Sequence, residues 1–498
     1  MLTDYLLSPY FILLIPVLFY ILPYLKHSAL RGVPTPFPAA FTNLWLLYQC
    51  RSGKRYLAVD EAHKKYGPLV RIQPDHISVA DPKAVQIIYG HGNGYLKRQR
   101  GLFNTRDRTE HTRKRKTVAH TFSPKSISQF EQYMHSNLVE LVKQWSQISA
   151  SSPSGSYAGI DALHWFNYLA FDIIGDLAFG APFGMLPRNA DVAEVQSYPG
   201  GPITTAPAIE VLNRRGEVSA TLGCIPQLKQ YAKWLPDRFF RDGLAAVENL
   251  AGIATARVNV RLDTEKRSER VDLLARLMEG KDEQGNRLGR QELTAEALTQ
   301  LIAGSDTTSN TICALLYWCL KTPGVINQLQ EELDGIEVEE NGVPTFEAMK
   351  DLPYVNAVIQ ETLRIHSTSS LGLPRQIPAC GPPLKLHGYT FPPGTVLSVP
   401  TYTMHHSTTI WGPDADSFRP SRWPPYTSKL TEKQQEAFNP FSYGPRACVG
   451  RNVAEMEMKV IVGTVFRNFA FEKRQEELET REGFLRKPLG LNVGMRKR

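Results

Sequence analysis

Apolar residues recur along this chain with two spacings, and these spacings predict its secondary structure. Over residues 124–147, 161–179, 240–262 and 290–321 they recur every three or four positions, which predicts long helices. Two short runs, Leu69–Ile72 and Ile77–Val79, flank a Pro-Asp pair and predict a β-hairpin. A β-branched run over Thr395–Val399 predicts a strand late in the chain. The pattern therefore predicts a mainly helical fold with a small β region.

The pattern changes at the N-terminus, where residues 5–25 contain no charged side chain. A helix of this length covers about the hydrocarbon thickness of a bilayer, which predicts a membrane anchor over residues 1–30. Asp4 precedes the stretch and Lys26 and Arg31 follow it, so the positive-inside rule places the main body in the cytoplasm. A cleaved signal peptide is the alternative, but the basic start and small-residue cleavage site that it requires are not evident.

A proline-rich segment follows the predicted anchor. Gly32–Pro38 carries a proline at every second position from Pro34 onward, and such a segment is stiff and cannot continue a helix. We therefore expect a hinge over residues 31–45. No linker, repeat or low-complexity tract divides the rest of the 498 residues, which predicts one large domain over residues 46–498.

Charge and cysteine content narrow the possible partners. The net charge is +8, with the densest basic run at Arg113–Lys116, but no basic stripe interleaved with aromatics indicates nucleic-acid binding. The run is either a solvated face or a docking surface for an acidic redox partner. The six cysteines are scattered without a C-x-x-C pair, which indicates a reducing compartment rather than a disulfide framework.

Cys448 lies in the segment Phe441–Gly450, which reads F-S-Y-G-P-R-A-C-V-G. A thiol becomes a good iron ligand only when it is ionised, and an apolar pocket opposes that ionisation. Gly444 and Gly450 permit backbone angles closed to other residues, so that amide N–H groups can face the sulfur. A helical pattern begins at Val449, which places the positive end of a helix dipole beside the sulfur.

Two further side chains of this segment suit a flat, anionic cofactor. Arg446 offers a rigid cation for a carboxylate, and Phe441 offers an apolar shield. A buried cysteine after a turn is the alternative, but it leaves this spacing unexplained. Read as F-x-x-G-x-R-x-C-x-G, the segment resembles the haem-binding loop of the cytochrome P-450 superfamily. The resemblance implies a haem b cofactor whose iron is bound by Cys448, within a loop that includes Phe441, Arg446 and Gly450.

The helix predicted over residues 290–321 contains a polar stretch at its middle, Ala303–Thr308. Buried polar groups cost energy unless they are hydrogen-bonded, so we expect the helix to bend and to hold water there. An ordinary helix whose hydroxyls bond to its own carbonyls is the alternative. The stretch resembles the oxygen-binding helix of the same superfamily. This implies that Gly304 leaves room for dioxygen, Thr307 donates a hydrogen bond to it and Asp306 relays protons.

Other motifs extend the resemblance. Glu361 and Arg364 lie three residues apart, and by resemblance they form a buried triad with Arg422 that fixes the loop of Cys448. Without the resemblance, such a pair would be interpreted as a surface ion pair. The cations that by position would contact the haem propionates are Arg115, Arg375 and Arg446, with His405 or His406 as a further candidate.

Several longer phrases resemble one fungal subfamily, the benzoate 4-monooxygenases, at residues 60–67, 165–184, 211–217 and 480–488. The resemblance implies a monooxygenase of aromatic compound metabolism, anchored in the endoplasmic reticulum membrane with its catalytic domain facing the cytoplasm. It would take electrons from an NADPH-cytochrome reductase, or from a small b-type cytochrome, and hydroxylate a small aromatic acid, benzoate to 4-hydroxybenzoate.

Alternatives stay open at this point. A monooxygenase acting on another aromatic or lipophilic substrate, a haem-thiolate isomerase or dehydratase, and a non-catalytic haem sensor share many of these motifs. The hydroxyls of Ser367–Ser370 either bind the carboxylate of the substrate or cap turns. After Lys97, only Arg98–Arg100 precedes Gly101, where members of the family carry a longer loop that roofs the substrate pocket. The shortening is either a property of the protein or the result of an exon lost from the gene model.

Overall fold

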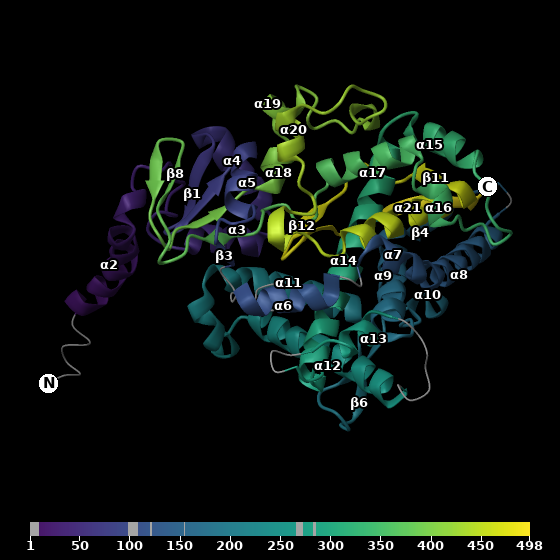
Figure 1. Cartoon of the computed structure of the whole chain (residues 1–498), viewed down its shortest axis with the longest axis horizontal. Helices are drawn as coiled ribbons and strands as arrows, with labels where there is room; N and C mark the ends of the chain where they lie inside the picture. The colour runs from purple at the N-terminus through teal and green to yellow at the C-terminus, as the bar shows by residue number, and fades with distance from the viewer. Residues whose placement is uncertain (1–8, 98–107, 120–121, 154, 265–271, 282–284) are drawn as a thin grey trace.

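The structure, a computed structural model, describes residues 9–97, 108–119, 122–153, 155–264, 272–281 and 285–498. Helices dominate it, and the five-stranded sheet and the hairpin over residues 384–391 lie on the side from which the N-terminal helix projects (Figure 1). The longer helices are α2 (Pro9–Lys26), α3 (Leu44–Ser52), α4 (Arg55–Tyr66), α5 (Pro82–Tyr89), α6 (Arg108–Ala119), α8 (Glu131–Ala150), α9 (Ala162–Phe179), α11 (Ala208–Cys224), α12 (Arg238–Thr264), α14 (Arg290–Lys321), α15 (Val325–Asp334), α17 (Pro353–Ile365) and α21 (Arg451–Asn468).

Short helices and small sheets complete the described fold. The short helices are α7 (Pro124–Ile127), α10 (Met185–Arg188), α13 (Leu273–Met278), α16 (Phe346–Met349), α18 (Thr401–His405), α19 (Thr408–Trp411) and α20 (Glu432–Ala437). One sheet has the strand order β1 (Leu69–Gln73), β2 (His76–Val79), β10 (Val396–Ser398), β7 (Arg375–Gln376) and β3 (Leu96–Lys97). A second sheet has the order β11 (Phe469–Lys473), β14 (Asn492–Lys497) and β4 (Ala158–Asp161). The two-stranded hairpins are β5 (Ala193–Gln196) with β6 (Ile203–Ala206), β8 (Leu384–Leu386) with β9 (Tyr389–Phe391) and β12 (Thr480–Glu482) with β13 (Arg486–Pro488).

Most of the predicted elements are confirmed. The hairpin β1–β2 pairs Leu69 with Val79, and the side chain of Asp81 caps α5 by accepting a hydrogen bond of 3.0 Å from the backbone N–H of Lys83. The helix predicted over residues 124–147 differs, because a 3-10 turn at Ser128–Phe130 separates α7 from α8. The mainly helical fold with a small β region is therefore confirmed.

Helices α9 and α14 form the centre of the helical part. Helix α9 is apolar around most of its circumference, and nearly all of its residues are buried, as expected for a core helix. It packs along α14 at close range, because a Cβ atom at Gly304 would lie 2.7 Å from Cδ1 of Ile174. The missing side chain at this position therefore brings the two helices together.

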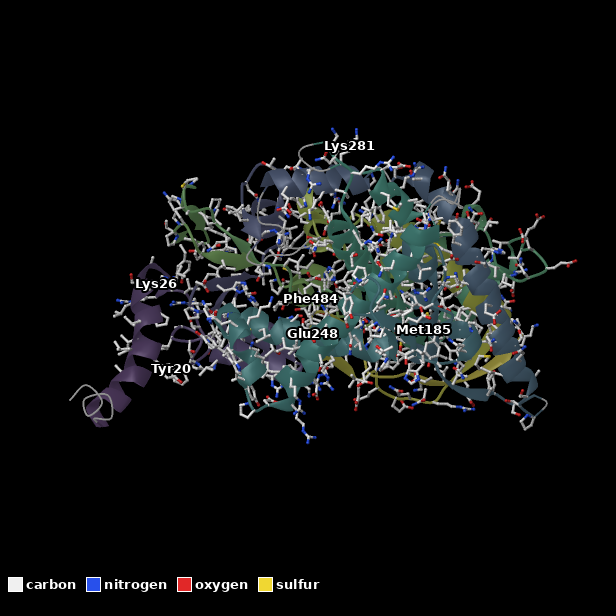
Figure 2. The ribbon with its side chains drawn as sticks, turned by 90° about the horizontal axis from the view of Figure 1, so that it is seen from below. Tyr20, Lys26, Met185, Glu248, Lys281 and Phe484 are labelled. Carbon is white, nitrogen blue, oxygen red and sulfur yellow. The ribbon has the colours of Figure 1, made fainter. Side chains whose placement is uncertain are left out.

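The turn of the β12–β13 hairpin packs against α11. A Cβ atom at Gly483 would lie 3.0 Å from the backbone nitrogen of Glu217, so the approach leaves no room for a side chain. Phe484, the next residue of the turn, is labelled in Figure 2. This packing brings strand β13 over the middle of α14.

No disulfide is formed among the described residues, and two of the six cysteines lie together. Cys50 on α3 and Cys224 at the end of α11 are buried, with their Sγ atoms 3.2 Å apart. This contact links the N-terminal part of the chain to the end of α11.

Helix α2 extends away from the body of the protein, as Figures 1 and 2 show, with Tyr20 and Lys26 labelled along it. Within residues 9–97 and the other described ranges, no helix has both the length and the apolar character needed to cross a membrane. The anchor over residues 1–30 stays a prediction, and its first eight residues lie outside the described ranges. The proline-rich segment that follows lies against the body, where the N–H of Arg71 donates to the carbonyl oxygen of Pro34 at 2.9 Å.

Candidate active site

Cys448 lies in a tight loop between a 3-10 turn, η7 (Gly444–Arg446), and the start of α21. Its backbone N–H donates to the carbonyl oxygen of Phe441 at 2.9 Å, which closes the loop. Gly444 has a φ of +72°, and a Cβ atom there would lie 1.9 Å from the carbonyl oxygen of Tyr89. The predicted requirement for glycine is therefore confirmed at residue 444, where the loop rests directly on the end of α5.

The same prediction is wrong for Gly450. Its φ is −83°, which any residue adopts, and it is the N-cap of α21. Within the loop, Ser442 takes the second positive φ, at +62°. The reason is that the chain turns before the cysteine rather than after it, so Gly450 only continues into the helix. Its backbone N–H still hydrogen-bonds to the sulfur of Cys448, as expected.

The surroundings of Cys448 act on its charge in opposite directions. Burial raises the pKa of the thiol, while the N–H of Gly450 and the cations of Arg115 and Arg451 lower it. The residue is nevertheless exposed at the protein surface, so the sulfur is accessible to a ligand. The thiolate form thus needs a further positive charge, such as a bound metal ion, to become the stable one.

Three arginines from distant parts of the sequence surround this loop. Arg115 on α6 donates from Nη1 to the carbonyl oxygen of Ala447 at 2.6 Å. Burial, Arg375 and Arg115 together lower the pKa of Arg446 to about 10. Arg115 and Arg375 therefore both lie close enough to Arg446 to repel its charge, and a bound anion would relieve that repulsion.

Arg375 has the most confined side chain of the three. It is buried, its guanidinium carbon lies 4.9 Å from the ring centroid of Tyr89, and burial lowers its pKa. Its Nη2 atom has no hydrogen-bond partner among the described residues. The Tyr89 hydroxyl accepts the backbone N–H of Val399 at 3.0 Å, which fixes the ring beneath the guanidinium. An unpaired buried guanidinium nitrogen indicates a site built for an acceptor.

The polar stretch of α14 is hydrogen-bonded within its own helix. The hydroxyl of Thr307 donates to the carbonyl oxygen of Ala303 at 2.7 Å, and that of Ser305 donates to Leu301 in the same way. The helix is continuous from Arg290 to Lys321. The bonding of these hydroxyls follows the ordinary-helix alternative, and bound water at this place stays a prediction.

Glu457 is a functional candidate that the sequence analysis missed. It is buried on α21, and its Oε2 accepts a hydrogen bond of 3.2 Å from the hydroxyl of Thr308. Burial raises its pKa to about 8, against the smaller opposing effect of Thr308. The only signal in the sequence is a glutamate within a buried helical stripe, at a position seven residues after Gly450.

The predicted triad is confirmed as a buried cluster. Arg364 Nη2 lies 2.7 Å from Glu361 Oε1, and Arg422 Nε lies 3.4 Å from the same oxygen. Arg364 also donates to the carbonyl oxygens of His405 and Ala415, at 2.7 and 2.6 Å. The cluster therefore holds the segment that precedes the loop of Cys448.

Both candidate histidines have structural partners instead of facing a cofactor. His405 accepts the backbone N–H of Asn439 at Nε2, and its Nδ1 bonds to Arg364. His406 pairs with Asp416 at 2.6 Å. Neither ring is free to contact a haem propionate.

Much of the basic run on α6 is also engaged internally. Arg113 pairs with Glu292 at 2.8 Å, and Lys114 pairs with Glu296 at 3.2 Å. Both glutamates belong to α14, so these cations serve helix packing. Lys116 is exposed and remains available to a partner.

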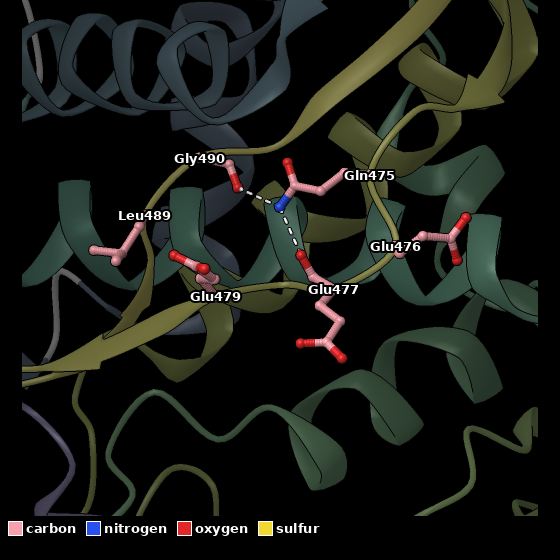
Figure 3. Close-up of a pocket in the computed structure, with 6 residues that line it drawn as sticks. All are labelled: Gln475, Glu476, Glu477, Glu479, Leu489 and Gly490. Carbon is pink, nitrogen blue, oxygen red and sulfur yellow. Dashed lines mark hydrogen bonds between the residues drawn. The ribbon is translucent and has the colours of Figure 1, made fainter.

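A surface hollow lies away from the loop of Cys448, between β11 and β13 (Figure 3). Gln475 crosses it by donating from Nε2 to the carbonyl oxygens of Glu477 and Gly490, at 2.7 and 3.4 Å. Its glutamates are exposed, and it contains none of the predicted site residues. The hollow therefore has no part in the candidate site.

This fold and this cysteine loop define a class of protein. The family model described as Cytochrome P-450 matches residues 32–495, and the chain belongs to that family. Its cofactor is haem, and its chemistry is that of a monooxygenase.

Individual relatives refine this assignment. The chain is 63% identical to benzoate 4-monooxygenase bphA of Aspergillus niger, over 99% of its own length and 98% of that protein's. It is 31% identical to the trichothecene C-4 hydroxylase of Trichoderma arundinaceum, over 84% and 81% of the two chains. It is 28% identical to a cytochrome P-450 monooxygenase of Aspergillus terreus, over 93% and 95%. The first alignment spans 510 positions, more than the 498 residues of this chain, so that relative carries residues that this chain does not have.

The residues present fit haem. The accessible thiol of Cys448 offers the soft donor that iron takes in haem-thiolate proteins. Arg446, with Arg115 and Arg375 close enough to repel its charge, suits two carboxylates, and the unpaired Nη2 of Arg375 suits one of them.

Proposed function

We propose that this chain hydroxylates benzoate to 4-hydroxybenzoate. The observation that carries the proposal is the 63% identity to benzoate 4-monooxygenase over 99% of the chain. This function requires a haem site, a side where oxygen binds and a surface that meets the electron donor. Candidate residues for each are found in the described part of the chain.

Cys448 would bind the haem iron, with Phe441 and Gly450 in the loop around it. The N–H of Gly450 and the cation of Arg115 stabilise the negative charge on the sulfur. The propionate partners are Arg115, Arg375 and Arg446. Haem, when bound in this way, supplies the oxygen activation that no side chain of the protein provides.

On the oxygen side, the middle of α14 supplies the polar groups. Thr307 donates a hydrogen bond on this side once its hydroxyl turns from the carbonyl oxygen of Ala303. Asp306, which is buried 3.7 Å from Nζ of Lys487, passes protons inward from solvent. Gly304 keeps the helix surface clear, although its close contact with Ile174 shows that it also serves helix packing.

The remaining partners follow from the same proposal. An NADPH-cytochrome reductase, or a small b-type cytochrome, supplies electrons, and the exposed Lys116 is one of the cations such a partner would meet. Residues 1–30 anchor the protein in the endoplasmic reticulum membrane, residues 31–45 connect the anchor, and the domain over residues 46–498 faces the cytoplasm. The uncharged stretch of residues 5–25 and the projection of α2 from the body support this arrangement (Figure 1).

The segment after Lys97 bears on the substrate. The predicted shortening there falls on residues 98–107, which lie outside the described ranges. A shorter roof would weaken the binding of a small substrate, because less apolar surface would enclose the ring.

The experiment is a titration of benzoate against the purified, haem-loaded protein, followed by turnover with a reductase and NADPH. The expected results are a low-to-high-spin shift and 4-hydroxybenzoate as the product. A spin shift with larger aromatics but none with benzoate contradicts the substrate. Product formation without NADPH would favour an isomerase or dehydratase instead.

A further inference from the structure

If the substrate is an aromatic acid, its carboxylate needs a cationic partner inside the protein. Resting on the function proposed above, we infer that Lys487 and Arg215 form the binding site for the substrate carboxylate, beside Asp306 on the oxygen side of α14. The two cations come from β13 and α11. Strand β13 contacts α14, and Lys487 links it to both Asp306 on α14 and Asn213 on α11.

Lys487 is the better enclosed of the two cations. Only 8% of the residue is exposed, and its Nζ lies 3.7 Å from Oδ2 of Asp306. Nζ also donates a hydrogen bond to Oδ1 of Asn213 on α11. Lysine carries three donors, and the partners named leave at least one for a further acceptor.

Arg215 interrupts the buried face of α11. It lies three or four residues from Val211, Leu212 and Val218, which are all buried, so it shares their side of the helix. Burial lowers its pKa, and the carboxylate of Asp306 opposes this effect. Among the described residues Arg215 makes no hydrogen bond or ion pair, and Asp306 is the acidic group that acts on its pKa. A partly buried guanidinium without a close acceptor is able to bind one.

The charge balance of this cluster favours an anion. Lys487 and Arg215 carry two positive charges, and Asp306 is the acidic group that acts on them. The next carboxylate along α11, Glu217, is already paired with Arg214 at 3.2 Å and with Arg481 at 3.0 Å. A bound carboxylate therefore removes one uncompensated charge from a partly buried site.

The hydroxyl segment Ser367–Ser370 fits this role less well. The hydroxyl of Ser370 donates to the carbonyl oxygen of Ser367 at 2.6 Å, which is the turn-capping alternative. Ser367 itself is buried and uncharged. A hydroxyl without a cation compensates the lost hydration of a carboxylate only in part.

The cluster lies beside the oxygen side proposed above, because Asp306 is the residue before Thr307 on α14. A carboxylate held at the cluster fixes one end of the ring, so the bound substrate presents a restricted set of ring carbons for oxidation.

The test compares charged and neutral probes on the haem-loaded enzyme. Arg215→Gln and Lys487→Gln should each raise the spectral dissociation constant of benzoate roughly tenfold or more, because a charge-assisted hydrogen bond is lost. Both should leave the dissociation constant of benzamide, the uncharged isostere, within about twofold. Arg214→Gln is the matched control, since it removes an equal charge from the next residue, and it should leave both constants unchanged.

Several outcomes separate this inference from the proposed function. Benzoate binding to both glutamine variants as tight as to the wild type overturns the inference and leaves the function intact. In another outcome, the wild type fails to bind benzoate but binds another aromatic acid, with weaker binding in both glutamine variants. That result would contradict benzoate as the substrate and support Lys487 and Arg215 as the carboxylate-binding site. If Arg215→Gln does not retain haem, Arg215→Lys tests the same charge and should weaken benzoate binding less than Lys487→Gln does.

Discussion

At the scale of single residues, the environment of each ionisable group decides its protonation state. Burial raises the pKa of both Cys448 and Glu457 and so favours their neutral forms, but the two side chains differ in their surroundings. Cys448 is accessible, and nearby cations already lower the pKa of its thiol. A bound metal ion can therefore make the thiolate the stable form. Glu457 is fully enclosed, and a single hydroxyl is its only described hydrogen-bond partner.

Replacing Cys448 by serine should remove the iron ligand while preserving the loop, because the two side chains differ by one atom. We expect Cys448→Ser to lose the strongly red-shifted Soret band of the reduced, CO-bound protein. Cys380→Ser is a suitable control, since that cysteine is exposed and lies outside the site. Retention of the band in Cys448→Ser would disprove the assignment.

Replacing Glu457 by glutamine should remove a pH dependence of stability. The folded protein keeps the proton up to about pH 8, whereas the unfolded chain releases it near the ordinary pKa of 4.5. The contribution of Glu457 is therefore complete below about pH 4.5 and is lost progressively as the pH rises toward 8. We expect the Tm of the wild type, relative to Glu457→Gln, to fall across this window and then to level off.

The control for this measurement is Glu455→Gln, two residues earlier on the same helix. Glu455 pairs with Arg451 at the surface, at 2.7 Å. Its replacement should give a nearly constant difference in Tm over the same pH range. An equal slope in both variants would show that the trend does not come from Glu457.

At the scale of elements, identical spacings lead to different interactions. Glu361 and Arg364 are three residues apart on α17 and fully buried, whereas Arg276 and Glu279, at the same separation, are partly exposed near the end of α13. Only the first pair also holds neighbouring segments through backbone carbonyls. The tertiary surroundings, not the spacing, make the pair structural.

We expect Arg364→Lys to lower the apparent Tm by roughly 3–5 °C, because breaking a buried pair costs about 3–5 kcal/mol and each residue contributes about 2.1 cal/mol/K to the unfolding entropy. Haem retention should fall as well. The matched change Arg276→Lys should shift the Tm by less than about 1 °C. Equal shifts in a thermal melt of the haem-loaded proteins would contradict the structural role of the triad.

The sequence predicted the local features well, because they depend on near neighbours. The hairpin β1–β2, the cap at Asp81 and the α14 helix follow from short patterns. Contacts between distant segments could not be predicted in this way. The approach of Tyr89 to Gly444 and that of Thr308 to Glu457 arise only from packing, and the correction at Gly450 shows that a motif does not fix each φ angle.

At the scale of the whole molecule, the predicted anchor and the folded body are separable. Deleting residues 1–30 should move much of the protein from the membrane fraction to the soluble fraction without loss of haem, because the described site residues lie in the body. Leu18 and Leu22 are both exposed on α2, and replacing both by lysine should also move protein from the membrane fraction to the soluble fraction, without shortening the chain. Secretion of a full-length chain with a cleaved N-terminus would contradict the anchor.

The three-stranded sheet has a consequence for biosynthesis. Its middle strand, β14, follows every described helix in the sequence, yet it pairs with β4, which precedes α9. While a ribosome makes the intervening chain, β4 has no partner along that edge, and the loop of Cys448 does not yet exist. Haem can therefore be enclosed only after the helical core and the loop of Cys448 have been synthesised, at a late stage of translation.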